Sequence, residues 1–138
     1  MDLERYTDNA KETMVEAMEN AKALDHQTIT TAHVIKSILL NNKQRFRKLI
    51  ELVGGDYFSV LQEADKLLIS LPKVEGHKNL FIDANLSEAI KSAEIYADKL
   101  GDKFIGLEAL FLGIALGQSE ISKKLKSKVK NIDKLEDF

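Results

Sequence analysis

Three histidines are the residues of this chain best suited by type to bind a metal ion or transfer protons. They stand at positions 26, 33 and 77, and no Cys accompanies them, which excludes thiolate zinc sites, disulfides and a Cys nucleophile. A helical metal site needs two His four residues apart with a Glu beside them, and that spacing is absent. His26 and His33 are seven residues apart and flank a predicted loop. The spacing favours a structural or surface role over metal binding.

A glycine-containing segment partly matches a phosphate-binding loop. Residues 101–106 read Gly-Asp-Lys-Phe-Ile-Gly, the first half of that motif. In a nucleotide site a strand precedes the motif and Lys with Ser or Thr follows it, whereas here a predicted helix precedes it and Leu107 and Glu108 follow. The Gly-x-Ser-x-Gly turn of serine hydrolases is also absent from the sequence. We therefore predict no catalytic, metal or cofactor site in this chain, and no enzyme activity of its own.

Five lysines between residues 123 and 130 form the most basic part of the sequence. They lack the interleaved aromatic side chains that stack on nucleic-acid bases. The whole chain has 20 Lys and Arg against 22 Asp and Glu, a net charge of −2, so it has no general attraction to a polyanion. We expect a solvated face here and no nucleic-acid partner.

Polar residues at predicted helix starts are the remaining candidates for a site. Thr7 precedes a helical run, while Asp102 and Glu108 enclose a short loop before another helix. Each could be a simple helix cap, because oxygen atoms there accept bonds from unpaired backbone N–H groups and interact favourably with the helix dipole. The alternative is one polar surface that the fold assembles from all three residues. The sequence alone leaves both open.

Helices must position these residues, because apolar side chains recur every three or four positions through most of the chain. The first helix is predicted over residues 7–24 and the second begins near Thr30. The third ends at 54–55, and the fourth runs from 56 to 71, where Pro72 stops it. No segment alternates with a period of two for long enough to indicate a sheet. The sequence predicts an all-α fold.

The helical pattern occurs twice. Apolar residues at 10, 14, 17, 21 and 24 recur at 86, 90, 93, 97 and 100, and the two numbers of every pair differ by 76 (86 − 10 = 76, for example). This offset, which we call the repeat shift, also pairs Ile29 with Ile105 and Val53 with Val129, so one register persists through two loops. Shared helical periodicity alone does not keep a register that far. The pattern therefore indicates a tandem duplication of a four-helix motif.

Length and composition agree with one compact domain over residues 1–138. The chain has 138 residues, a length typical of one domain, and 44% of them are hydrophobic. The predicted repeats span about 1–71 and 80–138 and are joined by a polar linker at 72–79, and the last helix, around 131–138, has little chain left. No stretch resembles a secretion signal or reaches the ~18 apolar residues of a membrane span. We expect a cytoplasmic monomer with no membrane partner.

Several segments resemble the N-terminal domain of Clp-type AAA+ chaperones. They are residues 1–7 (MDLERYT), 25–35 (DHQTITTAHVI), 71–76 (LPKVEG) and 100–105 (LGDKFI) with Glu108 behind it. The similarity covers essentially the whole chain, the tandem repeat included. The segment between the repeats is most similar to the ClpB branch, the disaggregases, rather than to ClpA or ClpC.

The resemblance implies a non-catalytic domain that a linker beyond residue 138 tethers to two ATPase modules, where ATP would bind. It implies a parent homohexamer that works with the DnaK chaperone system and threads polypeptides through a central pore. In that assembly this domain would capture unfolded or aggregated polypeptide. The alternative is docking of a folded adaptor, or regulation of the ring by blocking its pore.

The resemblance also implies site residues. Those linked to substrate engagement in the family fall on Thr7, Asp102 and Glu108, and all three residue types are retained. The associated apolar groove would map to three positions where the family often has Leu, and this chain has Ser92, Tyr96 and Ala109.

Those substitutions imply that apolar recognition is weaker than in the family, or that it uses neighbours such as Ile95, Phe104 and Leu110. We expect a shallow groove with carboxylates that favour basic flanks, and an affinity that is micromolar or poorer (a Kd of ~1 μM or more). In the ClpC branch a Glu in the repeat helps to recognise phosphoarginine. The first repeat of this chain has Ala32 at that position, so we do not expect phosphoarginine binding here.

Overall fold

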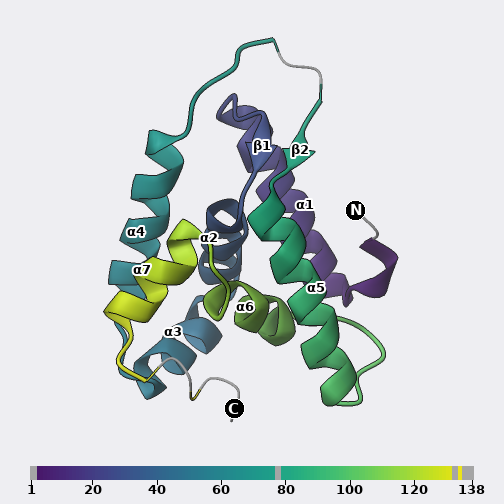
Figure 1. Ribbon diagram of the computed structural model, residues 1–138, viewed down its shortest axis with the longest axis vertical. Coiled ribbons are helices and arrows are strands. Elements are labelled where there is room, and N and C mark those ends of the chain that lie inside the picture. The colour runs from purple at the N-terminus through teal and green to yellow at the C-terminus, as the bar shows by residue number, and fades with distance from the viewer. Residues whose placement is uncertain (1–2, 77–78, 132–133, 135–138) are drawn as a thin grey trace.

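The computed structural model describes residues 3–76, 79–131 and 134, and it is built almost entirely from helices (Figure 1). His77 and most of the segment predicted as a last helix, at 131–138, lie outside the described residues. A 3-10 turn, η1 (Leu3–Arg5), opens the chain. The helices are α1 (Asp8–Ala23), α2 (Thr31–Asn41), α3 (Lys43–Leu52), α4 (Tyr57–Ser70), α5 (Ala84–Lys99), α6 (Leu107–Ala115) and α7 (Glu120–Lys128).

Local sequence signals fix most helix ends. Four helices begin behind a side chain that accepts a hydrogen bond from a backbone N–H three residues on, and these caps are Thr7, Asp56, Asp83 and Ser119. The first helix of each repeat is followed by a residue in the left-handed region, Asp25 (φ 59°) and Gly101 (φ 74°), and the repeat shift relates these two positions. The two copies of the motif therefore keep the same backbone turn with different residues.

The tandem repeat predicted from the sequence is confirmed by the order of the elements. The repeat shift carries the bounds of α1, 8 and 23, onto those of α5, 84 and 99. The same shift places α2 on α6 and α3 on α7. The counterpart of α4 would begin at residue 133, almost wholly outside the described residues. The division into 1–71, a linker and 80–138 stays a prediction.

Short parallel strands link the repeats, and the sequence did not indicate them, although the predicted all-α class is confirmed. β1 (Thr28–Ile29) pairs with β2 (Phe81–Ile82), and Tyr6 forms an isolated bridge with Ile105. Pairs of two residues are too short to produce an alternating sequence pattern.

The two pairings are themselves related by the repeat shift. The backbone N–H of Thr7 donates to the Ile105 carbonyl at 3.0 Å, and that of Asp83 donates to the Ile29 carbonyl at 3.2 Å. Each repeat thus hydrogen-bonds the entry of its first helix to the loop of the other repeat. This reciprocal exchange holds the two repeats together as one unit.

A single apolar core runs through both repeats, and side chains from α3 and α6 meet in it. The rings of Phe46 and Phe111, both fully buried, are 5.1 Å apart. The tightest contact joins α5 and α6, where a Cβ on Gly113 would lie 2.3 Å from the carbonyl oxygen of Ala89. Only glycine allows two helices to approach this closely.

The described part of the connector that follows α4, residues 71–76, lies at one end of the molecule (Figure 1). It is tied down at Val74, whose backbone N–H donates to the Asp25 carbonyl at 2.8 Å. Among the helices that the structure describes, none has the length and apolar character needed to cross a membrane.

Candidate functional site

The start of α6 brings together two of the three polar candidates. Gly106 is the N-cap residue, and it offers no side chain to cap the helix. A Cβ at this glycine would lie 3.6 Å from the Glu108 Oε2 atom and 3.9 Å from the Thr7 methyl group. Thr7 reaches this place because its backbone N–H donates to the Ile105 carbonyl. Thr7 and Glu108 therefore flank the same helix start from different repeats.

Thr7 also caps α1. Its Oγ1 atom accepts from the backbone N–H of Ala10 at 3.2 Å. Thr7 can therefore cap α1 and also belong to a shared polar surface. Its oxygen accepts the hydrogen bond from Ala10, and its hydroxyl proton is still available to donate to another group.

Glu108 lies in the first turn of α6, where the helix dipole favours a negative charge. Its carboxylate forms an ion pair with the guanidinium of Arg45, which α3 contributes from the first repeat. Both side chains remain about half exposed, at 44% for Glu108 and 54% for Arg45. Nothing in the sequence indicated this pair, because its members come from different repeats and from helices that do not correspond.

Asp102 stands apart from these two. Its backbone N–H donates to the Ala97 carbonyl at 2.9 Å and closes the turn after α5, while its side chain is exposed. No hydrogen bond or ion pair joins its carboxylate to any residue that the structure describes. The structure therefore assembles Thr7 and Glu108 and leaves Asp102 as a separate charge near the end of α5.

The three positions predicted to form an apolar groove lie on the α5–α6 hairpin. Ser92 and Tyr96 are half-buried and one turn apart on α5, whereas Ala109 on α6 is only 4% exposed. Of the suggested neighbours, Ile95 and Phe104 are exposed at 55% and 46%. Ala109 and Leu110 are core residues instead, since Leu110 has no exposed surface.

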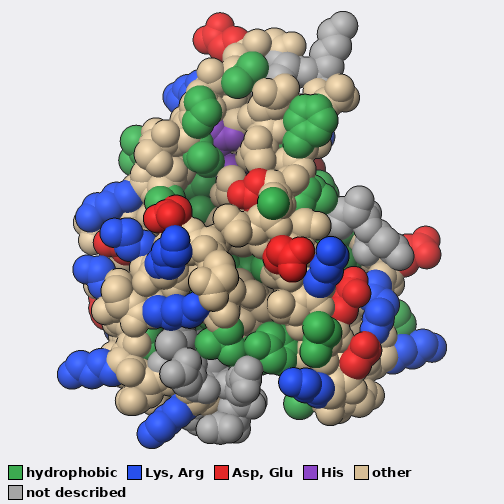
Figure 2. Space-filling view, viewed as in Figure 1, with side chains coloured by type: hydrophobic (Ala, Val, Ile, Leu, Met, Phe, Trp, Pro, Cys, Tyr) green, Lys and Arg blue, Asp and Glu red, His purple; other side chains and the backbone are tan. Residues whose placement is uncertain are grey.

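Two further apolar residues complete this surface, and the sequence did not single them out. Leu112 on α6 and Leu116, the C-cap residue of that helix, are partly buried, and they extend the row that begins at Glu108 at intervals of four residues. We call Ser92, Tyr96, Leu112 and Leu116 the α5–α6 face. Figure 2 shows hydrophobic side chains in a row over α6 and the adjoining part of α5.

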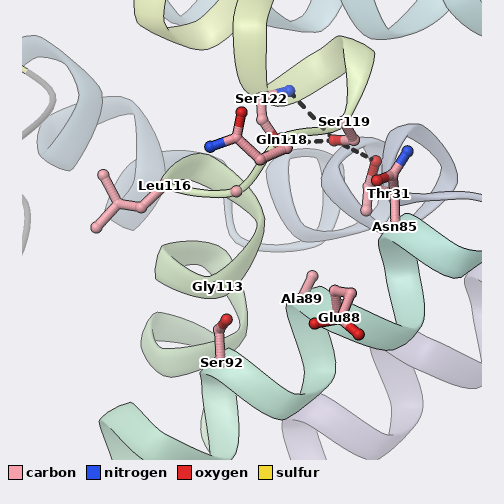
Figure 3. A pocket seen from close by; sticks show the side chains of 11 residues that line it. Thr31, Asn85, Glu88, Ala89, Ser92, Gly113, Leu116, Gln118, Ser119 and Ser122 are labelled. Atoms are coloured by element: carbon pink, nitrogen blue, oxygen red, sulfur yellow. Dashed lines mark hydrogen bonds between the residues drawn. The ribbon is translucent and has the colours of Figure 1, made fainter.

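One end of this face is hollowed into a polar pocket of about 280 Å³ (Figure 3). Ser92 and Leu116 belong to its lining. Its back wall is a chain of hydroxyls in which Thr31 donates to Ser119 at 2.8 Å and Ser119 lies 2.6 Å from Ser122. This chain ends on the Ile114 carbonyl, to which Ser122 donates. The three hydroxyls thus satisfy one another, and Asn85, Glu88, Ser92 and Gln118 contribute further polar side chains to the lining.

The two described histidines form a buried pair in the first repeat. His33 Nδ1 accepts from the Thr30 backbone N–H at 2.9 Å, so His33 Nε2 carries the proton and donates to His26 Nδ1 at 2.8 Å. Burial lowers the pKa of His33 to about 4, with smaller contributions from His26 and Lys36, and burial also lowers the pKa of His26. The pair is therefore neutral at pH 7 and caps α2.

Within the described residues, no group of three or more His, Asp or Glu side chains could hold a metal ion. What the structure does present is a duplicated helical bundle with a polar helix start and a partly exposed apolar face beside it. A partly exposed apolar face beside a polar helix start is typical of surfaces that bind other molecules.

The chain belongs to the family described as the Clp repeat (R) N-terminal domain, whose model matches residues 5–128. As a member it is a non-catalytic N-terminal domain of Clp ATPases. It is 31% identical over 129 residues to the chaperone protein ClpB of Rhizobium meliloti. The alignment covers 93% of this chain and 15% of that relative, so this chain spans about a seventh of the relative's length.

Solved structures share the fold. The Hsp104 N-terminal domain from Candida albicans matches with a TM-score of 0.79 at 16% identity, over 95% of this chain and 88% of that one. A complex of the ClpV N-domain with VipB peptide matches with a TM-score of 0.70 at 15% identity, over 97% and 84% of the two chains.

Proposed function

We propose that this domain captures unfolded or aggregated polypeptide for the ATPase ring of a ClpB-type disaggregase, and that the α5–α6 face is the docking surface. The observation that carries the proposal is the difference between this face and its counterpart in the first repeat. The repeat shift relates Tyr96 to Asn20 and Leu112 to Lys36. Two positions of the α5–α6 face are therefore apolar where the first repeat is polar, whereas Leu116 corresponds to Leu40, an apolar residue that is 49% exposed.

Charge beside the face supports a preference for basic segments. Glu108 precedes Leu112 by one helical turn, and Asp102 lies in the loop between α5 and α6. A polypeptide that places an apolar residue on Tyr96 or Leu112 brings a neighbouring Lys or Arg close to a carboxylate. Single contacts of this kind give weak binding, which suits a motor that must release its client. Six tethered copies around one pore would raise the effective concentration.

The family and a neighbour support polypeptide as the ligand. ClpB relatives are chaperones, and a ClpV N-domain of the same fold has been solved with VipB peptide bound. That second observation also favours the other candidate function, docking of one defined adaptor or partner segment. Work with the DnaK system, hexamer formation and ATP binding would belong to the rest of the protein.

Binding of a fluorescently labelled, unfolded casein-like polypeptide tests the proposal. Tyr96→Ser and Leu112→Ser should each weaken binding by about five- to ten-fold, the usual effect of losing a central interface contact. Their counterparts Asn20→Ser and Lys36→Ser should leave it within about two-fold, and circular dichroism verifies that all four variants fold.

Equal binding by all four variants would contradict the proposed surface. Failure to bind unfolded polypeptide, together with saturable binding of one folded partner, would favour adaptor docking.

A further inference from the structure

The ion pair between Arg45 and Glu108 occupies the carboxylate that the proposed function assigns to basic clients. Of the two carboxylates that the proposed function assigns to basic clients, Asp102 has no such partner among the described residues, whereas Glu108 pairs with Arg45 of the first repeat. In the free domain, the Arg45 guanidinium therefore already pairs with the Glu108 carboxylate, the group that a Lys or Arg of a client would bind.

The core places Arg45 where it can do this. Phe46, the next residue on α3, is fully buried and packs on Phe111, which follows Glu108 by three residues on α6. Residues three apart on a helix share a face, so this aromatic contact fixes the α3 backbone close to Glu108. The pairing of the guanidinium with Glu108 thus follows from buried packing, although both charged groups are half exposed.

The pair has no equivalent in the other half of the molecule. Under the repeat shift Glu108 corresponds to Ala32, and Arg45 corresponds to Ile121, which is buried. The neighbouring Arg47 differs from Arg45, because it pairs at 2.9 Å with Glu51 on its own helix. Of the two arginines on α3, Arg45 pairs with a described residue of the second repeat, whereas the partner of Arg47 lies on α3 itself.

We infer that Arg45 is an internal competitor for Glu108 and determines how basic a polypeptide must be to dock beside the α5–α6 face. This inference rests on the proposed function. An incoming Lys or Arg gains the Glu108 contact only by displacing Arg45, so isolated basic residues gain little. Segments with several basic residues, or with an Arg that pairs through two hydrogen bonds, displace it more readily.

The test measures binding of two synthetic unfolded peptides, one with Lys and Arg beside apolar residues and one with Gln in their place. Arg45→Gln should bind the basic peptide roughly two- to five-fold more tightly than the wild type, the range expected for an exposed ion pair. The neutral peptide should bind unchanged. Arg47→Gln is the matched control, since it removes the same charge from the same helix without freeing Glu108.

Two variants together complete the design. In an Arg45→Gln/Glu108→Gln double variant the gain should vanish, because the freed carboxylate is gone. The inference is overturned if Arg45→Gln binds the basic peptide no better than Arg47→Gln, or binds it more weakly than the wild type. Loss of binding to both peptides in every form, wild type included, would instead refute polypeptide capture itself and the inference with it.

Discussion

The two repeats share one backbone plan but differ on the surface that their first two helices form together. In the first repeat the α1–α2 surface carries Glu16, Asn20 and Lys36, and α4 packs beside it, with Lys36 paired to Asp65 at 2.8 Å. In the second repeat Ser92, Tyr96 and Leu112 occupy the corresponding positions. Duplication kept the packing, and divergence placed Tyr96 and Leu112 where the first copy has polar side chains, while Leu40, the counterpart of Leu116, is apolar and half exposed in the first copy.

The buried side of the same helix pairs differs as well. Gly113 allows α6 to lie against α5, whereas its counterpart in the first repeat is Ser37, a buried residue whose hydroxyl has no hydrogen-bond partner among the described residues. The loop before the second helix and the first turn of that helix hold the His26–His33 pair in the first repeat, and Asp102 and Ala109 stand at these positions in the second. These differences predict that the repeats respond unequally to matched substitutions.

The largest expected effect comes from filling the space at Gly113. In Gly113→Ala the new methyl group meets the Ala89 carbonyl, a backbone atom that no side-chain rotation can move away. We expect a loss of about 3 kcal/mol or more in the free energy of unfolding, measured by urea denaturation. The matched change Ser37→Ala should shift it by less than about 0.5 kcal/mol, because it removes an unpaired hydroxyl. A similar response at both positions would contradict the asymmetric packing.

Acid should destabilise the first repeat through its histidine pair. The pKa of His33 is about 4 in the folded state and 6.5 in a free chain, so below pH 6.5 the unfolded state binds more protons. Stability contributed by neutral His33 is therefore complete above pH 6.5 and falls as the pH drops toward 4, by roughly 2–3 kcal/mol. His33→Gln keeps a side chain that can accept from the Thr30 N–H but cannot titrate.

Unfolding of the wild type and His33→Gln at pH 7 and pH 4 isolates this contribution. The free energy of unfolding of the wild type, relative to that of His33→Gln, should fall by roughly 2–3 kcal/mol from pH 7 to pH 4. Parallel pH profiles would show that the buried pair does not link folding to protonation.

Of the three predicted losses of stability, the smallest is expected at the equivalent caps of α1 and α5. Thr7 accepts from Ala10 at 3.2 Å and Asp83 accepts from Leu86 at 2.7 Å. Thr7→Ala should cost about 1 kcal/mol and Asp83→Ala slightly more, because the Asp83 carboxylate also interacts with the helix dipole. Thermal unfolding measures both, and Thr7→Ser should retain nearly all of the stability. No loss in Thr7→Ala would show that its hydroxyl is not needed as a cap.

Much of the fold could be predicted because its signals are local. The apolar stripe through Met14 and Ala17, and its repetition at Ile90 and Ala93, indicated both the helices and the duplication. Strand pairing between Ile29 and Ile82 could not be predicted in this way. It depends on two segments that are distant in the sequence, one on each side of the connector, and that meet only after the helices have packed.

The site was predicted less completely, for a related reason. The sequence singled out Thr7 and Glu108 by residue type and position. The hydrogen bond from the Thr7 backbone N–H to the Ile105 carbonyl brings them together, and nothing in the sequence indicated it. Nothing in the sequence distinguished Leu112 and Leu116 from core residues, because periodicity does not tell which apolar residues of a helix stay partly exposed. Arg45 carried no sequence signal at all, since its partner is set by the contact of Phe46 with Phe111.

An NMR titration of the isotope-labelled domain with an unfolded casein-like polypeptide tests the central claim most directly. The account predicts that backbone signals from residues 92–116, Tyr96, Glu108 and Leu112 among them, shift together. It also predicts that signals from the corresponding residues 16–40 stay in place. Shifts that cluster on 16–40, or that spread equally over both repeats, would contradict the assignment of polypeptide docking to the second repeat.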